Sequence, residues 1–136
     1  YEMYLLRNKS KQGTGFFMNA GFYPDFIMWI VKGKKQWISF IEPHGMLHEK
    51  GDVLSCDKVK LAHTINDIED VKKHKNLTLN SYIITPTPIK RIWPSIAPKD
   101  DQEEALRILH EHHLYASEEG IDNVVMSIVG DVVGKK

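Results

Sequence analysis

The chain has 136 residues, of which 42% are hydrophobic, so its length and composition predict one compact domain with a single core. No apolar stretch approaches the ~18–20 residues that span a bilayer, and the single cysteine, Cys56, excludes an intramolecular disulfide and a cysteine-based zinc site. The formal net charge is zero, but residues 1–91 carry 14 Lys/Arg against 9 Asp/Glu, whereas residues 92–136 carry 4 against 9. These features predict a cytoplasmic domain, and the start at Tyr1 without a leader predicts a fragment of a longer protein.

The basic excess of the first 91 residues gathers in short clusters. These are Lys9/Lys11, Lys32/Lys34/Lys35, Lys72/Lys73/Lys75 and Lys90/Arg91. Such clusters either neutralise phosphate groups or belong to ordinary solvated surface. The sequence leaves both interpretations open.

The first 42 residues predict a hairpin. Residues 1–8 are apolar enough for a helix end or a strand, and residues 9–15 read as a polar turn. Two apolar runs follow, FYPDFIMWIV at 22–31 and QWISFIE at 36–42, and they flank the sequence KGKK. Their wealth of Ile, Val, Trp and Phe favours two strands joined by a tight turn.

The middle of the chain predicts a helix and a third strand. Apolar residues between Asp57 and about Lys73 recur with helical spacing, which predicts one helix of roughly four turns. The apolar stretch 81–85 is bounded by Pro86 and Pro88 and predicts a strand, and residues 86–98 are expected to form a surface loop.

The last third predicts two helices. Asp100 and Asp101 can cap a helix that ends near His113. A short apolar stretch at 114–116 and an acidic turn through Gly120 follow it. The sequence VVMSIVGDVV then predicts a final short helix.

The hairpin brings two carboxylates together. If the turn is Gly33-Lys34, with Gly first as a type II′ turn prefers, the numbers of opposite residues sum to 67 and Asp25 faces Glu42. If the turn is Lys32-Gly33, the two are diagonal neighbours roughly 7–8 Å apart. In both registers they lie on one sheet face.

Two facing carboxylates repel unless a cation or a proton lies between them. Mg2+ is such a cation, since it prefers oxygen ligands and is commonly held by one or two carboxylates together with waters and substrate phosphate. The alternative is that Asp25 and Glu42 only terminate strands beside Pro24 and Pro43. Because both faces of the hairpin are apolar, we expect it inside an α/β sandwich, with a mixed central sheet flanked by helices.

These segments resemble the PD-(D/E)XK nuclease superfamily, whose motif is Pro-Asp on one strand and acid-x-Lys on the next. Here the motif reads Pro24-Asp25 and Glu42-Pro43-His44. A closer resemblance is to the C-terminal endonuclease region of type III restriction enzyme (Res) subunits and related DEAD/DEAH-box helicase proteins. It covers roughly residues 1–116, through YLLRN at 4–8, GFYPDFIMWI at 21–30, FIEPHG at 40–45, DKVKLAHTI at 57–65 and LNSYIITPTP at 79–88.

The resemblance implies a restriction-endonuclease-like three-layer sandwich that spans residues 1–136 as a single endonuclease-like domain. Its activity would be Mg2+-dependent hydrolysis of DNA, with Mn2+ as a possible substitute. The chain lacks a GxxxxGK[ST] loop, so ATP would be used only by an N-terminal helicase motor outside it. DNA, that motor and a modification subunit are the expected partners.

The resemblance also assigns site residues. Asp25 and Glu42 would bind Mg2+, and Glu2 is the only candidate for a glutamate that the family often supplies from its first helix. His44 stands where the family has lysine, so it is either a general base, an extra ligand or a histidine without catalytic duty. Lys58 either supplies the missing ammonium or is a solvated lysine.

The departure at His44 motivates an alternative function, a catalytically impaired nuclease-like module that binds DNA or docks a subunit. A third possibility is an interaction domain without nucleic acid. The run of residues 110–113 is not the HExxH zinc motif and reads as surface and partly buried helix. Trp29 and Trp37 fit a core better than a base-stacking platform, whereas Trp93 could contact nucleic acid or pack on the domain.

Overall fold

The computed structural model describes residues 1–8, 24–46, 53–92 and 101–134. The strands are β1 (Glu2–Arg7), β2 (Phe26–Lys32), β3 (Lys35–Pro43), β4 (Leu77–Thr85) and β5 (Leu114–Ala116). The helices are α1 (Asp57–Thr64), α2 (Glu69–Lys72), α3 (Ile89–Ile92), α4 (Gln102–Glu111) and α5 (Ile121–Gly134). Short 3-10 turns lie at η1 (Val53–Ser55), η2 (Ile65–Asp67) and η4 (Ser117–Glu119).

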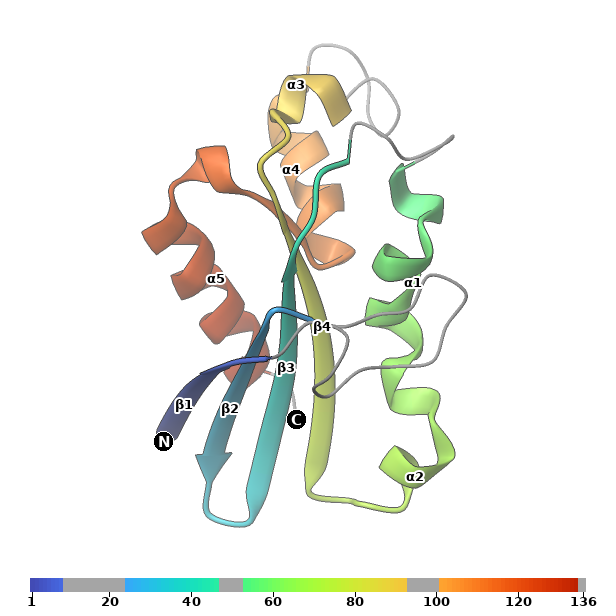
Figure 1. The fold of residues 1–136 in the computed structure, drawn as a ribbon, viewed down its shortest axis with the longest axis vertical. Helices are drawn as coiled ribbons and strands as arrows, with labels where there is room; N and C mark the ends of the chain where they lie inside the picture. Colours follow the sequence, from blue (N-terminus) through green and yellow to red (C-terminus); the bar gives the residue numbers. More distant parts are fainter. Residues whose placement is uncertain (9–23, 47–52, 93–100, 135–136) are drawn as a thin grey trace.

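The strands form one mixed sheet in the order β1-β2-β3-β4-β5 (Figure 1). The first three strands are antiparallel to one another, and β3, β4 and β5 are parallel. Parallel neighbours need crossover connections, which the α1–α2 segment supplies between β3 and β4 and the α3–α4 segment between β4 and β5. The mixed α/β architecture is therefore confirmed.

Helices cover both faces of the sheet, as the two-sided hydrophobicity of the hairpin predicts. One side, which we call the α5 face, packs Met28, Trp37 and Tyr82 against Val124 and Ile128 of α5. On the other side, the α1 face, residues of β2, β3 and β4 pack against Leu61 of α1 and Ile65 of η2. The strand residues are Ile27, Ile38, Phe40, Leu77 and Leu79. Further along that side a third cluster joins α1, α3, α4 and β5. The layering is compatible with a three-layer sandwich.

The hairpin turn confirms the first of the two expected registers. Lys32 pairs with Lys35 and Phe26 with Ile41, so the turn residues are Gly33 and Lys34. Gly33 has φ +60°, while Lys34 does not adopt a positive φ. This combination is the sign pattern of a type II′ turn, in which the first central position favours glycine.

The expected single helix from residue 57 to 73 is wrong in its continuity. The chain forms α1, then η2, and it is extended at Ile68 (ψ 126°) before α2 begins. Asn66 explains the interruption, because its side-chain amide donates to the Leu79 carbonyl at 2.8 Å and accepts from the Leu79 amide at 2.9 Å. An uninterrupted helix would not direct this side chain to the backbone of β4.

The remaining elements extend the expectations. Residues 1–8 contain a strand, the third strand begins at Leu77 rather than 81, and the expected loop after it contains α3. Residues 114–116 form β5, and α5 contains the expected final helix. In the described residues, no helix has the length and apolar character needed to cross a membrane.

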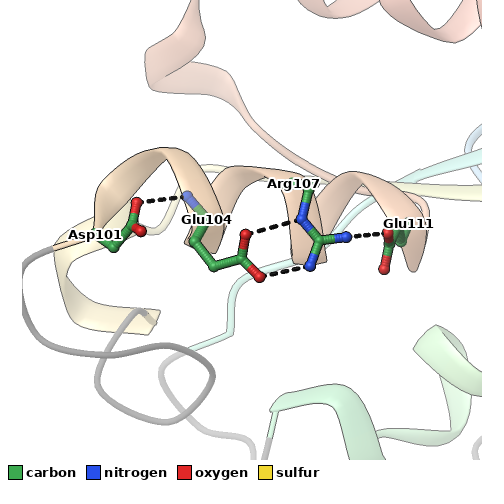
Figure 2. Close-up of polar contacts among 4 residues, drawn as sticks. All are labelled: Asp101, Glu104, Arg107 and Glu111. Atoms are coloured by element: carbon green, nitrogen blue, oxygen red, sulfur yellow. Dashed lines mark hydrogen bonds and ion pairs between the residues drawn. The ribbon is translucent and has the colours of Figure 1, made fainter.

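Helix α4 begins where its capping residues predict (Figure 2). The carboxylate of Asp101 accepts from the Glu104 amide at 2.9 Å, which is the N-cap bond. Arg107 donates to Glu104 and also pairs with Glu111 on the exposed side of the helix. The bond from Arg107 lowers the pKa of Glu104.

Candidate active site

Glu42 lies near the end of β3, the central strand of the sheet. It is 8% exposed and is aligned with Ile83 of the neighbouring β4. Residues alternate between the two faces of a strand, so Glu42 shares the α1 face with Phe40. The sequence has thus placed a carboxylate where an apolar side chain would otherwise complete the core, and burial of a charge is costly without compensation.

Lys58 of α1 provides that compensation. Its Nζ lies 3.0 Å from Oε2 of Glu42, and the two side chains are 17% and 10% exposed. The helix begins just before this residue, so the first turn of α1 directs the ammonium at the end of β3. Lys58 is therefore paired with Glu42 and is not a solvated lysine, whereas its role as the missing ammonium of the site stays a prediction.

Among the residues that the structure describes, none donates a hydrogen bond within the usual angles to the buried Oε2 atom of Glu42, even though the Lys58 ammonium is close enough for an ion pair. The contact with Lys58 is therefore a charge contact more than an aligned hydrogen bond. A buried carboxylate oxygen in this state retains directions in which it can bind another donor or a cation. This is the property that a hard-metal ligand needs.

Asp25 directly precedes β2 and is half-buried. Its carbonyl accepts from the Asn8 amide at 2.7 Å, which anchors the residue beside the end of β1. The ladder between β2 and β3 ends at Phe26 and Ile41, so Asp25 lies one step beyond it, at the position that the same register would align with Glu42. By alternation both belong to the α1 face. Joint binding of a metal by the two carboxylates remains a prediction.

His44 follows β3 and is half-buried. Its amide donates to the Ile84 carbonyl at 3.1 Å, so its backbone continues the parallel pairing with β4 past Pro43. Residues two apart on an extended chain point to one side. The expected placement of His44 beside Glu42 follows from this backbone, whereas its chemical role stays a prediction.

Glu2 does not belong to this site, and its expected place in it is wrong. The residue lies in a strand, not in a helix, and it pairs with Val31 near the hairpin turn. Val31 is six residues from Asp25, which corresponds to about 20 Å along a strand. The exposed carboxylate of Glu2 instead accepts from the Tyr4 hydroxyl at 2.9 Å, and this bond raises the pKa of Tyr4.

Across residues 1–8, 24–46, 53–92 and 101–134 there is no group of three or more His, Cys, Asp and Glu side chains that could hold an ion. The expected binding of Mg2+ by Asp25 and Glu42 stays a prediction.

The histidines near the end of α4 have hydrogen-bond partners within the domain. His110 pairs with Glu119 at 2.8 Å, and His113 binds the Ser81 carbonyl through Nδ1 at 3.0 Å. His113 also stacks on Tyr82, whose hydroxyl donates to Asp131. Burial and this hydrogen bond raise the pKa of Tyr82.

Sequence reasoning missed part of the α1 face. Trp37 is 4% exposed, as expected, but Trp29 is 38% exposed, so its assignment to the core is wrong. Trp29 lies on β2, one strand in from the edge strand β1, and the apolar character of a residue does not reveal whether a helix covers it. Trp93 and the cluster Lys9/Lys11 lie outside the described residues.

Comparison of the chain with protein-family models, with curated proteins and with solved structures finds no match. The architecture rests on the structure itself, which shows an α/β domain with a five-stranded mixed sheet in the described residues.

Proposed function

We propose that this domain is a metal-dependent deoxyribonuclease with a restriction-endonuclease-like fold. The observation that carries the proposal is the buried carboxylate of Glu42, which lies at the end of the central strand with an unsatisfied Oε2 and the Lys58 ammonium at 3.0 Å. An acid that can hold a metal ion and a lysine that can stabilise negative charge are groups that assist hydrolysis of a phosphodiester. The resemblance of Pro24-Asp25 and of residues 42–44 to the nuclease motif supports the same assignment.

Asp25 and Glu42 are the residues that would hold Mg2+, or Mn2+ in its place. The ion, when bound, supplies an activated water and stabilises negative charge on the phosphate. Glu42 is fixed by β3 and by its burial, so its carboxylate loses little conformational freedom on binding. Asp25 is positioned through its backbone bond to Asn8.

Lys58 would take the role that the family gives to the lysine of its motif. Its ammonium reaches the same carboxylate from α1 rather than from β3, and there it can orient the attacking water and support the charged phosphate. His44 then has the remaining proton-transfer role, because an imidazole can accept the proton of that water near neutral pH.

The experiment is cleavage of plasmid DNA in Mg2+ by the full protein that carries this chain. We expect Asp25→Ala, Glu42→Gln and Lys58→Met to lower the cleavage rate by about 100-fold or more, as removal of a transition-state contact does. Lys60→Met is the matched control, since Lys60 is an exposed lysine of the same helix. Equal rates for the wild type and Asp25→Ala would reject the proposal.

A second candidate function is a nuclease-like module that has lost cutting and binds DNA or docks a subunit. Two observations favour it: histidine stands in the lysine position, and Lys58 already neutralises Glu42 without a metal. A His44→Lys variant separates the two, because gained cutting would indicate a decayed site, whereas lost cutting would show that His44 itself takes part in the reaction.

The larger context belongs to the same proposal. By its resemblance, the domain would act within a type III restriction or DEAD/DEAH-box helicase-type enzyme, with ATP hydrolysed by a motor outside this chain and a modification subunit as partner. Cleavage that requires ATP in the full protein would support this context. Equal cleavage without ATP would contradict it and leave the nuclease assignment intact.

A further inference from the structure

A basic hollow of about 550 Å³ lies at the beginning of β3. Gln36 and Ile38 line it from β3, and Lys73, His74 and Lys75 line it from the segment that precedes β4. Gln36, Ile38 and Glu42 alternate onto the same side of β3, because they are separated by even numbers of residues. The hollow and the candidate active site therefore share the α1 face.

Two exposed lysines belong to this hollow. Lys73 and Lys75 line it from the segment before β4, and both residues are exposed. The Gln36 amide donates to the Asn76 carbonyl at 2.8 Å, so this segment lies at the same end of the sheet as the hairpin turn (Figure 1). Lys35 is adjacent to Gln36 on β3 and therefore belongs to the α5 face, away from the hollow. The ammonium groups of Lys73 and Lys75 create a positive potential that favours an anionic partner.

Two exposed aromatic residues lie on the same sheet face as the hollow. Trp29 is the cross-strand partner of Ile38, which lines the hollow, and also of Tyr4 on the edge strand. The Trp29 and Tyr4 ring centroids are 5.8 Å apart, and the residues are 38% and 48% exposed. Glu42 follows Ile38 by four residues, about 13 Å along the strand. Lysines, aromatic rings and the carboxylate thus succeed one another on one face.

We propose that this surface binds a single-stranded segment of nucleic acid, with its phosphates at the lysines and a base stacked on Trp29. Exposed ring faces favour a single strand over a duplex, because bases in a duplex already stack on their neighbours. A basic groove combined with aromatic rings is how proteins hold single strands without sequence preference. The inference deepens the proposed nuclease function and rests on it in one respect. The proposed function supplies the direction of the bound strand, which would lead toward Glu42 and Lys58.

The first test measures the affinity of the full protein for a labelled oligothymidine of about 20 nucleotides, longer than the ~4–16 nucleotides of typical single-strand sites. EDTA is present, so metal-dependent cutting does not occur. The double variant Lys73→Gln, Lys75→Gln should bind more weakly, and the slope of log K against log salt should shrink by up to about 1.4, since each lost phosphate contact removes about 0.7. The control variant combines Lys90→Gln with Arg91→Gln. Both wild-type residues are exposed cations of α3, and this variant should retain the slope.

The second test addresses stacking. Trp29→Leu should reduce affinity by about 5- to 150-fold, whereas Trp29→Phe, which keeps a ring, should retain most of it. Thermal unfolding of both variants reports whether they fold. If Trp29→Leu does not fold, Tyr4→Leu, at an exposed residue, tests the same surface. Wild-type affinity in the double lysine variant, or equal affinity of Trp29→Leu and wild type, would overturn the proposal.

A duplex of the same length that binds more tightly and is insensitive to Trp29 would also overturn it. Failure of the nuclease assignment has a different signature, because loss of cutting in Mg2+ with oligothymidine still retained in EDTA rejects only the nuclease. Loss of retention with cutting intact rejects only this surface.

Discussion

The ion pair between Glu42 and Lys58 makes a quantitative prediction about stability. At an effective dielectric constant of about 20, two unit charges 3.0 Å apart attract each other by about 5.5 kcal/mol. Desolvation of both groups offsets part of this attraction, and removal of one partner from a buried pair costs about 3–5 kcal/mol. Because Lys58 is still 17% exposed, we expect Lys58→Met to lower the free energy of unfolding by about 2–3 kcal/mol.

Urea unfolding followed by circular dichroism measures this change, with Lys60→Met as the control on the same helix. Lys60 is exposed, so its substitution should change the free energy by less than about 0.5 kcal/mol. A double-mutant cycle with Glu42→Gln isolates the interaction between the two side chains and should give a coupling free energy of about 2 kcal/mol. Addition of Mg2+ should recover more stability in Lys58→Met than in wild type, since a bound cation replaces the lost ammonium.

Two results would refute the reasoning. Equal loss of stability in Lys58→Met and Lys60→Met would show that the pair contributes nothing specific. A coupling free energy near zero would show that Glu42 tolerates burial for a reason other than Lys58. In either case the assignment of the family lysine's role to Lys58 would lose its structural basis.

Two further predictions concern the turn and the buried tyrosines. Gly33→Ala should lower the free energy of unfolding by about 1–2 kcal/mol, because φ is +60° there. Gly45→Ala is the control and should not lower it, since the φ of Gly45 is not positive and an added Cβ meets nothing within 4 Å. Denaturant midpoints of the two variants measure the difference. Burial, with Asp131 and Glu119 nearby, raises the pKa of Tyr115 to about 12. The folded state thus favours the neutral phenol, so the stability that Tyr115 contributes should be full below pH ~10 and fall as the pH rises toward ~12. Unfolding midpoints of wild type and Tyr115→Phe across this pH range measure the effect. The same pH dependence of the midpoint in both proteins would count against the assignment.

The sequence predicts best what neighbouring residues decide. The turn at Gly33 and the N-cap at Asp101 were predictable, because each depends on a preference of the residue for a local backbone conformation. The register of the hairpin followed from its turn. These local rules placed Asp25 and Glu42 at one end of the same sheet face before any tertiary contact was known.

Features that depend on distant residues were not predictable. The interruption after α1 arises from the bonds of Asn66 with Leu79, and helical periodicity contains no sign of a partner thirteen residues away. The contact of Lys58 with Glu42 depends on how α1 lies on the sheet. Glu2 was assigned by analogy with a helix, but the described residue belongs to an edge strand, which shows the limit of transferring a role without its element.

The chain separations in these contacts have a consequence for folding. The strands of the β1–β3 meander pair with their neighbours in sequence, and Lys58 contacts Glu42 across 16 positions. The contact of Asp131 with Tyr82, which ties α5 to the sheet, spans 49 positions. Since closing a longer loop costs more conformational entropy, the contact between Lys58 and Glu42 is expected to form early in folding and α5 to dock late.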